Sequence, residues 1–206
     1  MIAIVDYDAG NIKSVEKALL YLGEEVSITR DAEEILHAEK VILPGVGAFG
    51  EAMEKLHAYG LVPVIRQIVD QGTPFLGICL GLQLLFESSE ESPGVAGLGL
   101  LKGKILRLPK ESGLKIPHIG WNSLTYPNPG RLFKDLPEES YVYFVHSYYL
   151  KAEDAGIVTA KAWYGTDIHA SVEKDNIFAC QFHPEKSSGT GLKILQNFVA
   201  VGREAG

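Results

Sequence analysis

The chain has 206 residues, a net charge of −7 and only two cysteines, Cys79 and Cys180. Its length suits one domain, and its 46% hydrophobic and 22% charged residues exclude wholesale disorder. The acidic balance argues against nucleic-acid binding, which needs a basic face, and two cysteines exclude a disulfide framework. We find no export signal and no apolar run near the roughly twenty residues of a membrane span, so we expect a cytoplasmic protein.

Strands alternate with helices in the first half of the chain. Short apolar strands are predicted at residues 2–5, 25–29, 41–43 and 74–78. Helical spacing of apolar residues predicts helices over 12–22, 50–71 and 80–86, and Asp31 is positioned to cap a short acidic helix. This order predicts an α/β fold with an open, mostly parallel sheet and helices on both faces.

Turn residues, rather than helices, separate the strands of the second half. Strands are predicted at residues 104–108, 140–145, 157–163, 168–172 and 177–181, and a closing helix over 191–201. We therefore expect antiparallel strands attached to the parallel sheet. No internal repeat or linker divides the sequence, so residues 1–206 are predicted to form a single domain.

Cys79 lies in the segment Gly77-Ile78-Cys79-Leu80-Gly81, between a predicted strand and a predicted helix. This is a cysteine version of the Gly-x-Ser-x-Gly elbow, in which glycines allow a sharp turn and leave room around the nucleophile. A helix N-terminus would also favour the thiolate. Cys79 is therefore predicted to be a nucleophile, whereas Cys180, inside an apolar strand, is predicted to be a core residue.

A cysteine nucleophile needs a base, and the base needs a group that orients it. His183 follows a predicted strand and begins the sequence His183-Pro184-Glu185. At strand spacing, residues two apart point to the same side, so Glu185 can accept from one ring nitrogen while the other faces a thiol. His146 is a second candidate, and the remaining histidines are surface residues or lie beside strands with no obvious partner.

An acyl-transfer site also needs donors for a developing oxyanion. The glycine-rich stretch 44–49 ends another predicted strand and could turn a backbone N–H toward the site, and the Leu80 N–H would be the second donor. The stretch lacks the residues of a phosphate-binding loop. No histidine or cysteine pair has metal-ligand spacing, so we expect neither a metal nor a cofactor.

The segments 77–81 and 182–185 resemble the two main motifs of the class I, triad-type glutamine amidotransferases. Five further stretches, at 6–11, 43–49, 119–122, 144–148 and 182–187, are similar to those of the glutaminase subunits that serve histidine biosynthesis. The resemblance covers essentially the whole chain. It implies that Cys79 attacks the side-chain amide of glutamine, that His183 transfers protons, and that Glu185 orients His183.

The same resemblance implies how substrate and partner are bound. The oxyanion would be stabilised by Val46 or Gly47 together with Leu80, and glutamine would be contacted by Gly47, Gln83, Ser147 and Tyr148. The partner would be a (βα)₈-barrel cyclase that forms a heterodimer with this chain and receives ammonia through an internal channel. The implied partner surface comprises Asn11, Lys13, Trp121, Asn122, Tyr143 and Lys186.

Three alternatives remain open on the sequence. The chain could be the glutaminase subunit of another amidotransferase, such as that of pyridoxal phosphate synthesis. It could be a γ-glutamyl hydrolase or a cysteine peptidase on the same scaffold. A binding module without catalytic activity would leave Cys79 unreactive toward electrophiles that resemble glutamine.

Overall fold

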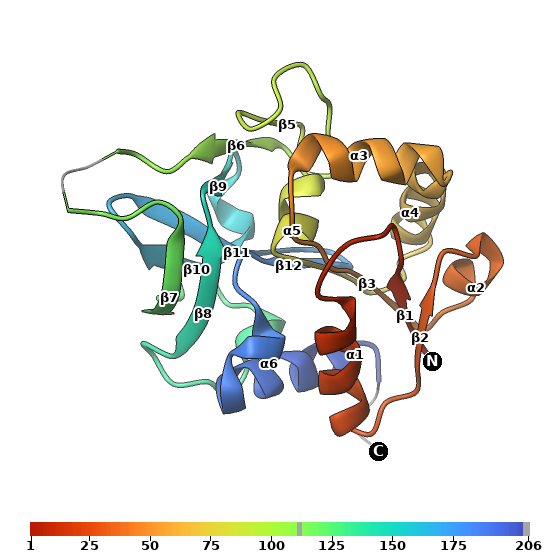
Figure 1. Cartoon of the computed structure of the whole chain (residues 1–206). Helices are drawn as coiled ribbons and strands as arrows, with labels where there is room; N and C mark the ends of the chain where they lie inside the picture. The colour runs from red at the N-terminus through yellow and green to blue at the C-terminus, as the bar shows by residue number, and fades with distance from the viewer. Residues whose placement is uncertain (111–112, 204–206) are drawn as a thin grey trace.

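A central sheet of seven strands organises the computed structural model, which describes residues 1–110 and 113–203 (Figure 1). Its spatial order is β10-β11-β12-β4-β3-β1-β2. The strands are β1 (Ile2–Val5), β2 (Val26–Thr29), β3 (Lys40–Leu43), β4 (Phe75–Ile78), β10 (Val158–Trp163), β11 (Asp167–Lys174) and β12 (Ile177–Cys180). The pairs from β12 to β2 are parallel, whereas β11 is antiparallel to both its neighbours. The predicted α/β fold is confirmed.

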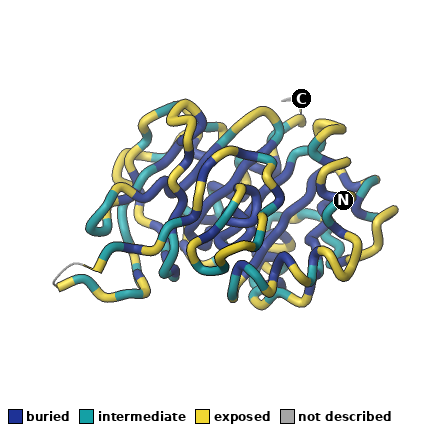
Figure 2. Tube along the Cα trace, turned by 90° about the horizontal axis from the view of Figure 1, so that it is seen from above, coloured by how far each residue is buried: buried dark blue, intermediate teal, exposed yellow. Residues whose placement is uncertain are grey.

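Helices cover both faces of this sheet, and side-chain alternation along the strands builds a core on each face. In β1, Ile2 and Ile4 pack into one core, whereas Ala3 and Val5 pack into the other. The first core is closed by α1 (Ile12–Tyr21) and α6 (Ser188–Ala200). The second is closed by α2 (Ala32–Leu36), α3 (Phe49–Ala58), α4 (Leu61–Asp70) and α5 (Leu80–Leu84). Buried residues run through the middle of the trace in Figure 2.

Two small sheets flank the central one. One contains β5 (Ser88–Ser89), β6 (Gly103–Arg107) and β9 (Tyr148–Ala152), and the other pairs β7 (His118–Ser123) with β8 (Tyr141–His146). Strands β5, β7 and β9 were not predicted. Short 3₁₀ turns follow at η1 (Arg131–Phe133), η2 (Ala155–Ile157) and η3 (Pro184–Lys186). No helix in the described part of the chain has both the length and the apolar character needed to span a membrane.

Three predicted helix boundaries were wrong. The stretch 50–71 is two helices, because Gly60 adopts a left-handed φ of 66° and separates α3 from α4. Helix α5 ends at Leu84, since Leu85 and Phe86 bond to carbonyls three residues back. Helix α6 begins at Ser188 rather than at 191. The prediction missed its first turn because residues 188–191 are serine, threonine and two glycines, which show no apolar periodicity.

Candidate active site

Cys79 occupies a sharp turn between β4 and α5. Its φ of 55° and ψ of −107° lie in a region that residues other than glycine rarely adopt, and its N–H is held by the Cys180 carbonyl at 2.8 Å. The flanking glycines are sterically required. A Cβ on Gly81 would lie 1.9 Å from the Leu43 carbonyl oxygen, and one on Gly77 would lie 2.7 Å from the Gly81 oxygen. The elbow therefore depends on both glycines.

His183 and Glu185 reach the same edge of the sheet as Cys79. Strand β12 pairs in parallel with β4, so that Cys180 lies beside Ile78 and the two chain segments leave the sheet together. The His183 N–H donates to the Tyr143 carbonyl at 2.9 Å. His183 Nδ1 lies 2.7 Å from Glu185 Oε1, and the two side chains are 1% and 0% exposed.

The backbone that brings His183 and Glu185 together differs from the predicted one. Residues after His183 do not continue the strand but form the 3₁₀ turn η3, with Pro184 at its first position. Proline suits that position because its φ is fixed and no N–H is required there. The Ser187 hydroxyl donates to the His183 carbonyl at 2.6 Å and closes the turn. The contact between ring and carboxylate was expected, but strand spacing was the wrong reason for it.

Asn11 joins this pair from the loop before α1. Its Nδ2 donates to Glu185 Oε1 and lies 3.4 Å from His183 Nδ1. The resemblance had implied that Asn11 belongs to the partner surface. The structure directs its side chain toward the carboxylate, while Asn11 itself remains partly exposed. Asn11 thus adds a second donor that holds the Glu185 oxygen beside the imidazole.

The electrostatics of the site favour a charged imidazole. Burial lowers the pKa of His183, but the nearby Cys79 sulfur and the Glu185 carboxylate outweigh this effect and raise the pKa to about 9. His183 Nε2 is buried and has no hydrogen-bond partner among the described residues. The ring can therefore carry a proton at neutral pH, and its second nitrogen remains available to a reacting group.

Cys79 opens into a cavity of about 280 Å³ at the edge of the sheet. The residues that the sequence had assigned to the oxyanion and to glutamine gather in its wall. The lining is Val46, Gly47, Cys79, Leu80, Gln83, Glu91, Pro117, Val145, His146, Ser147 and Tyr148. The structure thus brings together segments from the loops after β3, β4 and β8.

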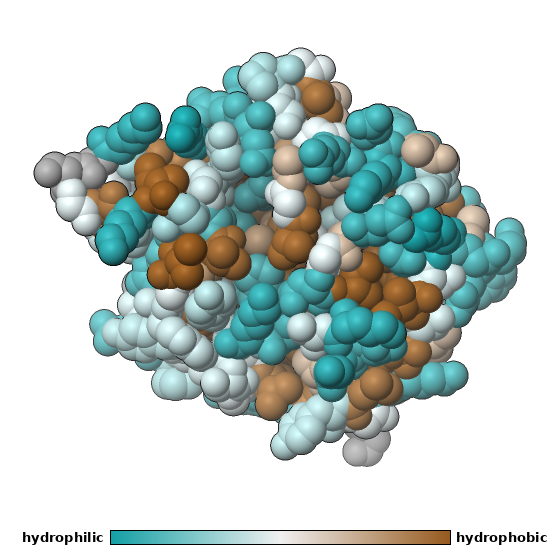
Figure 3. Space-filling model, in the orientation of Figure 1, coloured by the Kyte–Doolittle hydropathy of each residue, from teal (hydrophilic) through white to brown (hydrophobic). Residues whose placement is uncertain are grey.

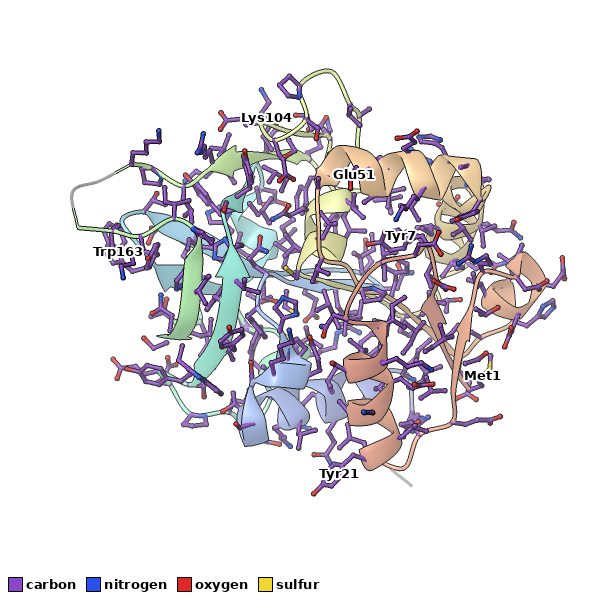
Figure 4. The ribbon with its side chains drawn as sticks, in the orientation of Figure 1. Met1, Tyr7, Tyr21, Glu51, Lys104 and Trp163 are labelled. Atoms are coloured by element: carbon purple, nitrogen blue, oxygen red, sulfur yellow. The ribbon has the colours of Figure 1, made fainter. Side chains whose placement is uncertain are left out.

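One of the two predicted oxyanion donors makes a hydrogen bond within the protein. The Leu80 N–H donates to the Gly45 carbonyl at 3.3 Å, so a backbone oxygen holds one of the two donors. Gly47 has a left-handed φ of 112°, and Val46 is 38% exposed. The buried Tyr7 hydroxyl, which is labelled in Figure 4, donates to the Pro44 carbonyl at 2.7 Å and anchors the same segment.

Four side chains at the site were not singled out from the sequence. Glu91 lines the cavity and accepts from the Phe49 N–H at 2.8 Å, which caps α3. Gln181 is fully buried and donates to the Cys79 sulfur at 3.6 Å. Tyr7 supports the segment after β3. No local motif marks Glu91 or Gln181, because their partners come from distant parts of the chain, whereas Tyr7 lies within the stretch 6–11.

His118, which was expected to have no partner, is the fourth of these residues. Its Nδ1 lies 3.0 Å from His146 Nε2, and His146 lines the cavity. The His118 ring also stacks on Tyr164, with centroids 3.9 Å apart. Cys180 is completely buried, as predicted for a core residue. No cluster of three His, Cys, Asp or Glu side chains suited to a metal ion occurs within 1–110 and 113–203.

The β7–β8 pair presents an apolar face beside the cavity. Ile119 and Trp121 are 60% and 50% exposed, and they pair with Val145 and Tyr143 across the two strands. Val145 also lines the cavity. Figure 3 shows hydrophobic surface over this region on the side turned to the viewer. Of the other residues in the implied partner surface, Lys13 and Lys186 are exposed, and Asn122 donates to the Trp163 carbonyl.

Comparison with known families gives one match over nearly the full length. The profile of the family described as "Glutamine amidotransferase class-I" matches residues 3–201. Among curated proteins, "Imidazole glycerol phosphate synthase subunit HisH" of Moorella thermoacetica is 52% identical over 205 residues, covering 100% of this chain and 97% of that protein. The protein of the same name from Methanocaldococcus jannaschii is 49% identical, covering 98% of this chain and 100% of that protein.

Solved structures share the fold at low sequence identity. A structure described as "Crystal structure of glutamine amidotransferase" superposes with a TM-score of 0.76 at 20% identity and covers 98% of each chain. The glutaminase domain of Trypanosoma brucei CTPS with bound acivicin has a TM-score of 0.64 at 17% identity, covering 96% of this chain and 93% of that chain. At these identities the likeness concerns the fold alone.

Proposed function

Because this chain belongs to the glutamine amidotransferase class-I family, and within it to the HisH subunits of imidazole glycerol phosphate synthase, we propose that Cys79, His183 and Glu185 carry out its glutaminase reaction. The reaction converts glutamine to glutamate and ammonia within histidine biosynthesis. The observation that carries the proposal is the meeting of a strained cysteine elbow with a buried imidazole–carboxylate pair at one cavity.

The Cys79 sulfur attacks the side-chain amide carbon of glutamine after His183 Nε2 has taken the thiol proton. The same proton passes to the departing nitrogen, so ammonia leaves and a γ-glutamyl thioester remains. Water then attacks the thioester, with His183 as base, and releases glutamate and the free thiol. Proton transfer of this kind contributes roughly 10²–10⁴ in rate. Glu185, which is held by Asn11, accepts from Nδ1, so that Nε2 is the nitrogen that faces the reaction.

The tetrahedral oxyanion would be stabilised by the Leu80 N–H and by a backbone N–H of Val46 or Gly47. A donor of this kind is commonly worth about 10²–10³ in kcat. Since the Gly45 carbonyl accepts from Leu80 N–H, the segment after β3 must turn before both donors can face the substrate. A chain in this conformation is expected to be a poor glutaminase on its own.

The hydrogen bonds of Gln83 restrict its role toward glutamine. Gln83 Nε2 donates to the Tyr148 carbonyl at 3.1 Å and to Gln181 Oε1 at 3.0 Å, so both N–H groups are used within the protein. Only the Gln83 oxygen remains, and it can accept from either donor of the substrate, the side-chain amide N–H or the α-ammonium group. The Glu91 carboxylate lines the same cavity and adds negative charge for that group. Gly47, Ser147 and Tyr148 would contact the remainder of the amino acid.

The relatives are named as subunits, and the ammonia released at this site has to be used by a second active site. We place a cyclase subunit with a (βα)₈-barrel fold against the β7–β8 face, forming a heterodimer that receives ammonia through an internal channel. The exposed Ile119 borders the cavity through its strand neighbour Val145, and the exposed Trp121 extends the same apolar face, which supports this face as the docking surface. Lys13 and Lys186 would add charge at its margin.

Glutamate release from free glutamine, measured with and without the cyclase subunit of the same organism, tests the proposal. We expect slow release by the isolated chain and a marked rise when the cyclase and its ligand are added. Full activity of the isolated chain would contradict the proposed dependence on a partner. Absence of glutamate release under both conditions would contradict the glutaminase role itself.

A further inference from the structure

Gln181 is buried between the nucleophile and the substrate-facing residue Gln83. Its side chain is completely inaccessible to solvent. Its Nε2 lies 3.6 Å from the Cys79 sulfur, and its Oε1 lies 3.0 Å from Gln83 Nε2. The two ends of one amide thus contact two different parts of the site. Which end faces the sulfur decides whether the sulfur meets a donor or an acceptor.

A backbone carbonyl fixes the orientation of both amides. The Tyr148 carbonyl can only accept, and the Gln83 side chain contacts it at 3.1 Å, so the contacting atom of Gln83 must be its Nε2. That nitrogen also contacts Gln181 and must meet its oxygen rather than a second N–H. The Gln181 Nε2 therefore faces the Cys79 sulfur. Reversing either amide would place two donors, or two acceptors, against each other in a buried site.

His146 also contacts the Tyr148 carbonyl that orients Gln83. Its Nδ1 lies 2.9 Å from the same Tyr148 carbonyl, so Nδ1 carries the proton and donates. The carbonyl then accepts from His146 and Gln83 together, which uses its full acceptor capacity. Gln83 cannot rotate without leaving a buried group unpaired.

We propose that Gln181 is a positioning residue whose side-chain N–H is held toward the Cys79 sulfur and favours its anionic form. This inference rests on the proposed role of Cys79 as nucleophile. A hydrogen bond to a charged acceptor is stronger than one to a neutral acceptor, so the donor stabilises the thiolate more than the thiol. It also holds the sulfur at the elbow in one direction while the amide of glutamine approaches.

The test is the pH dependence of Cys79 alkylation by iodoacetamide in the full-length chain, followed by peptide mapping. Gln181→Met keeps the volume of the side chain and removes its donor. We expect the pH of half-maximal rate to rise by roughly one to two units, which corresponds to a charged hydrogen bond. Cys180→Ala, at the neighbouring buried position, is the matched control and should leave this midpoint unchanged.

Gln181→Glu serves as a second variant if Gln181→Met does not fold. It keeps the shape and an acceptor toward Gln83, but it replaces the donor at the sulfur with an acidic group. The midpoint is expected to rise at least as far as in Gln181→Met. A wild-type midpoint in a folded Gln181 variant would overturn the proposal. Because iodoacetamide does not need the glutamine site, that result could occur while glutamate release still supports the proposed function.

Discussion

His183 Nδ1 and Glu185 Oε1 lie 2.7 Å apart at a site where both side chains are almost completely buried. Asn11 donates to the same carboxylate oxygen, so Glu185 is held from two sides. An imidazole in this contact keeps its proton on Nδ1 when neutral and is stabilised when charged. In the proposed reaction, the pair would therefore determine both which nitrogen reacts and over which pH range His183 is protonated.

Glu185→Gln is expected to lower the rate of glutamate release in the complex by roughly 10²–10⁴. The glutamine amide can present a donor to Nδ1, which would favour the wrong tautomer. Loss of the carboxylate also lowers the pKa of His183 from its value of about 9, so the alkaline limb of the pH–rate profile should move to lower pH. Rate profiles of both proteins check this. An alkaline limb at the wild-type position would contradict the role given to Glu185.

Cys79→Ala is expected to abolish glutamine-dependent synthesis in the complex with the cyclase. Synthesis from added ammonium salt should continue, because the cyclase needs only ammonia and this chain would still fold and bind. Product formation from each nitrogen source is the measurement. Equal loss of both activities would show that the two subunits do not divide the reaction as proposed.

Tyr7→Phe is expected to raise the glutaminase rate of the isolated chain. The Tyr7 hydroxyl holds the Pro44 carbonyl, and the next residue holds the Leu80 N–H away from the substrate. Losing a hydrogen bond worth about 1 kcal/mol would increase the population of the turned segment roughly five-fold. The partner should then stimulate the variant less than the wild type. An unchanged or lower basal rate would argue against restraint by Tyr7.

Acid should destabilise the chain before its carboxylates titrate. Burial lowers the pKa of His118 to about 4 and that of His146 to about 3, well below 6.5. Between pH 6.5 and these values the unfolded chain binds more protons than the folded chain, so stability falls as pH falls. Each ring contributes up to about 1.4 kcal/mol per pH unit in this window.

Urea unfolding at pH 7 and pH 5 measures this effect. His118→Phe should unfold with a weaker pH dependence, because one buried ring no longer takes up a proton on unfolding. The exposed His57 provides the control variant His57→Gln, which should keep the wild-type slope. If His118→Phe also kept that slope, burial of the neutral His118 would not explain the acid sensitivity.

Gly81→Ala should destabilise the fold by about 3 kcal/mol, at the upper end for overpacking. Its Cβ would lie 1.9 Å from the Leu43 carbonyl oxygen, and a backbone atom cannot move aside as a flexible side chain can. The free energy of unfolding in urea measures the effect. Gly189→Ala, where a Cβ meets nothing within 4 Å, is the matched control.

Much of the sheet could be predicted because its strands are short apolar runs bounded by turn residues. The elbow at Cys79 and the His183–Glu185 pair were also predictable, since each is contiguous in sequence. Strand β7 was missed because its outward positions, such as Ile119 and Trp121, are apolar while His118 is buried, which obscures the usual alternation. Its stability depends on pairing with β8.

The supporting residues of the site could not be predicted for a related reason. Gln181 and Glu91 lie in segments that carry no motif of their own, and each acts on a residue far away in the chain. Gln181 reaches Cys79 only because β12 and β4 are adjacent and parallel. Glu91 reaches Phe49 only through the fold of the chain after α5. Such contacts follow from topology, which local patterns do not specify.

The most direct test of the account is labelling of the full-length chain with a diazo-ketone analogue of glutamine in the presence of the cyclase. Peptide mapping should find the label on Cys79 alone, and glutamate release should be lost in proportion to the labelling. Excess glutamine should protect both. Undiminished glutamate release from a chain whose Cys79 is fully labelled would contradict the central claim that this sulfur attacks the substrate.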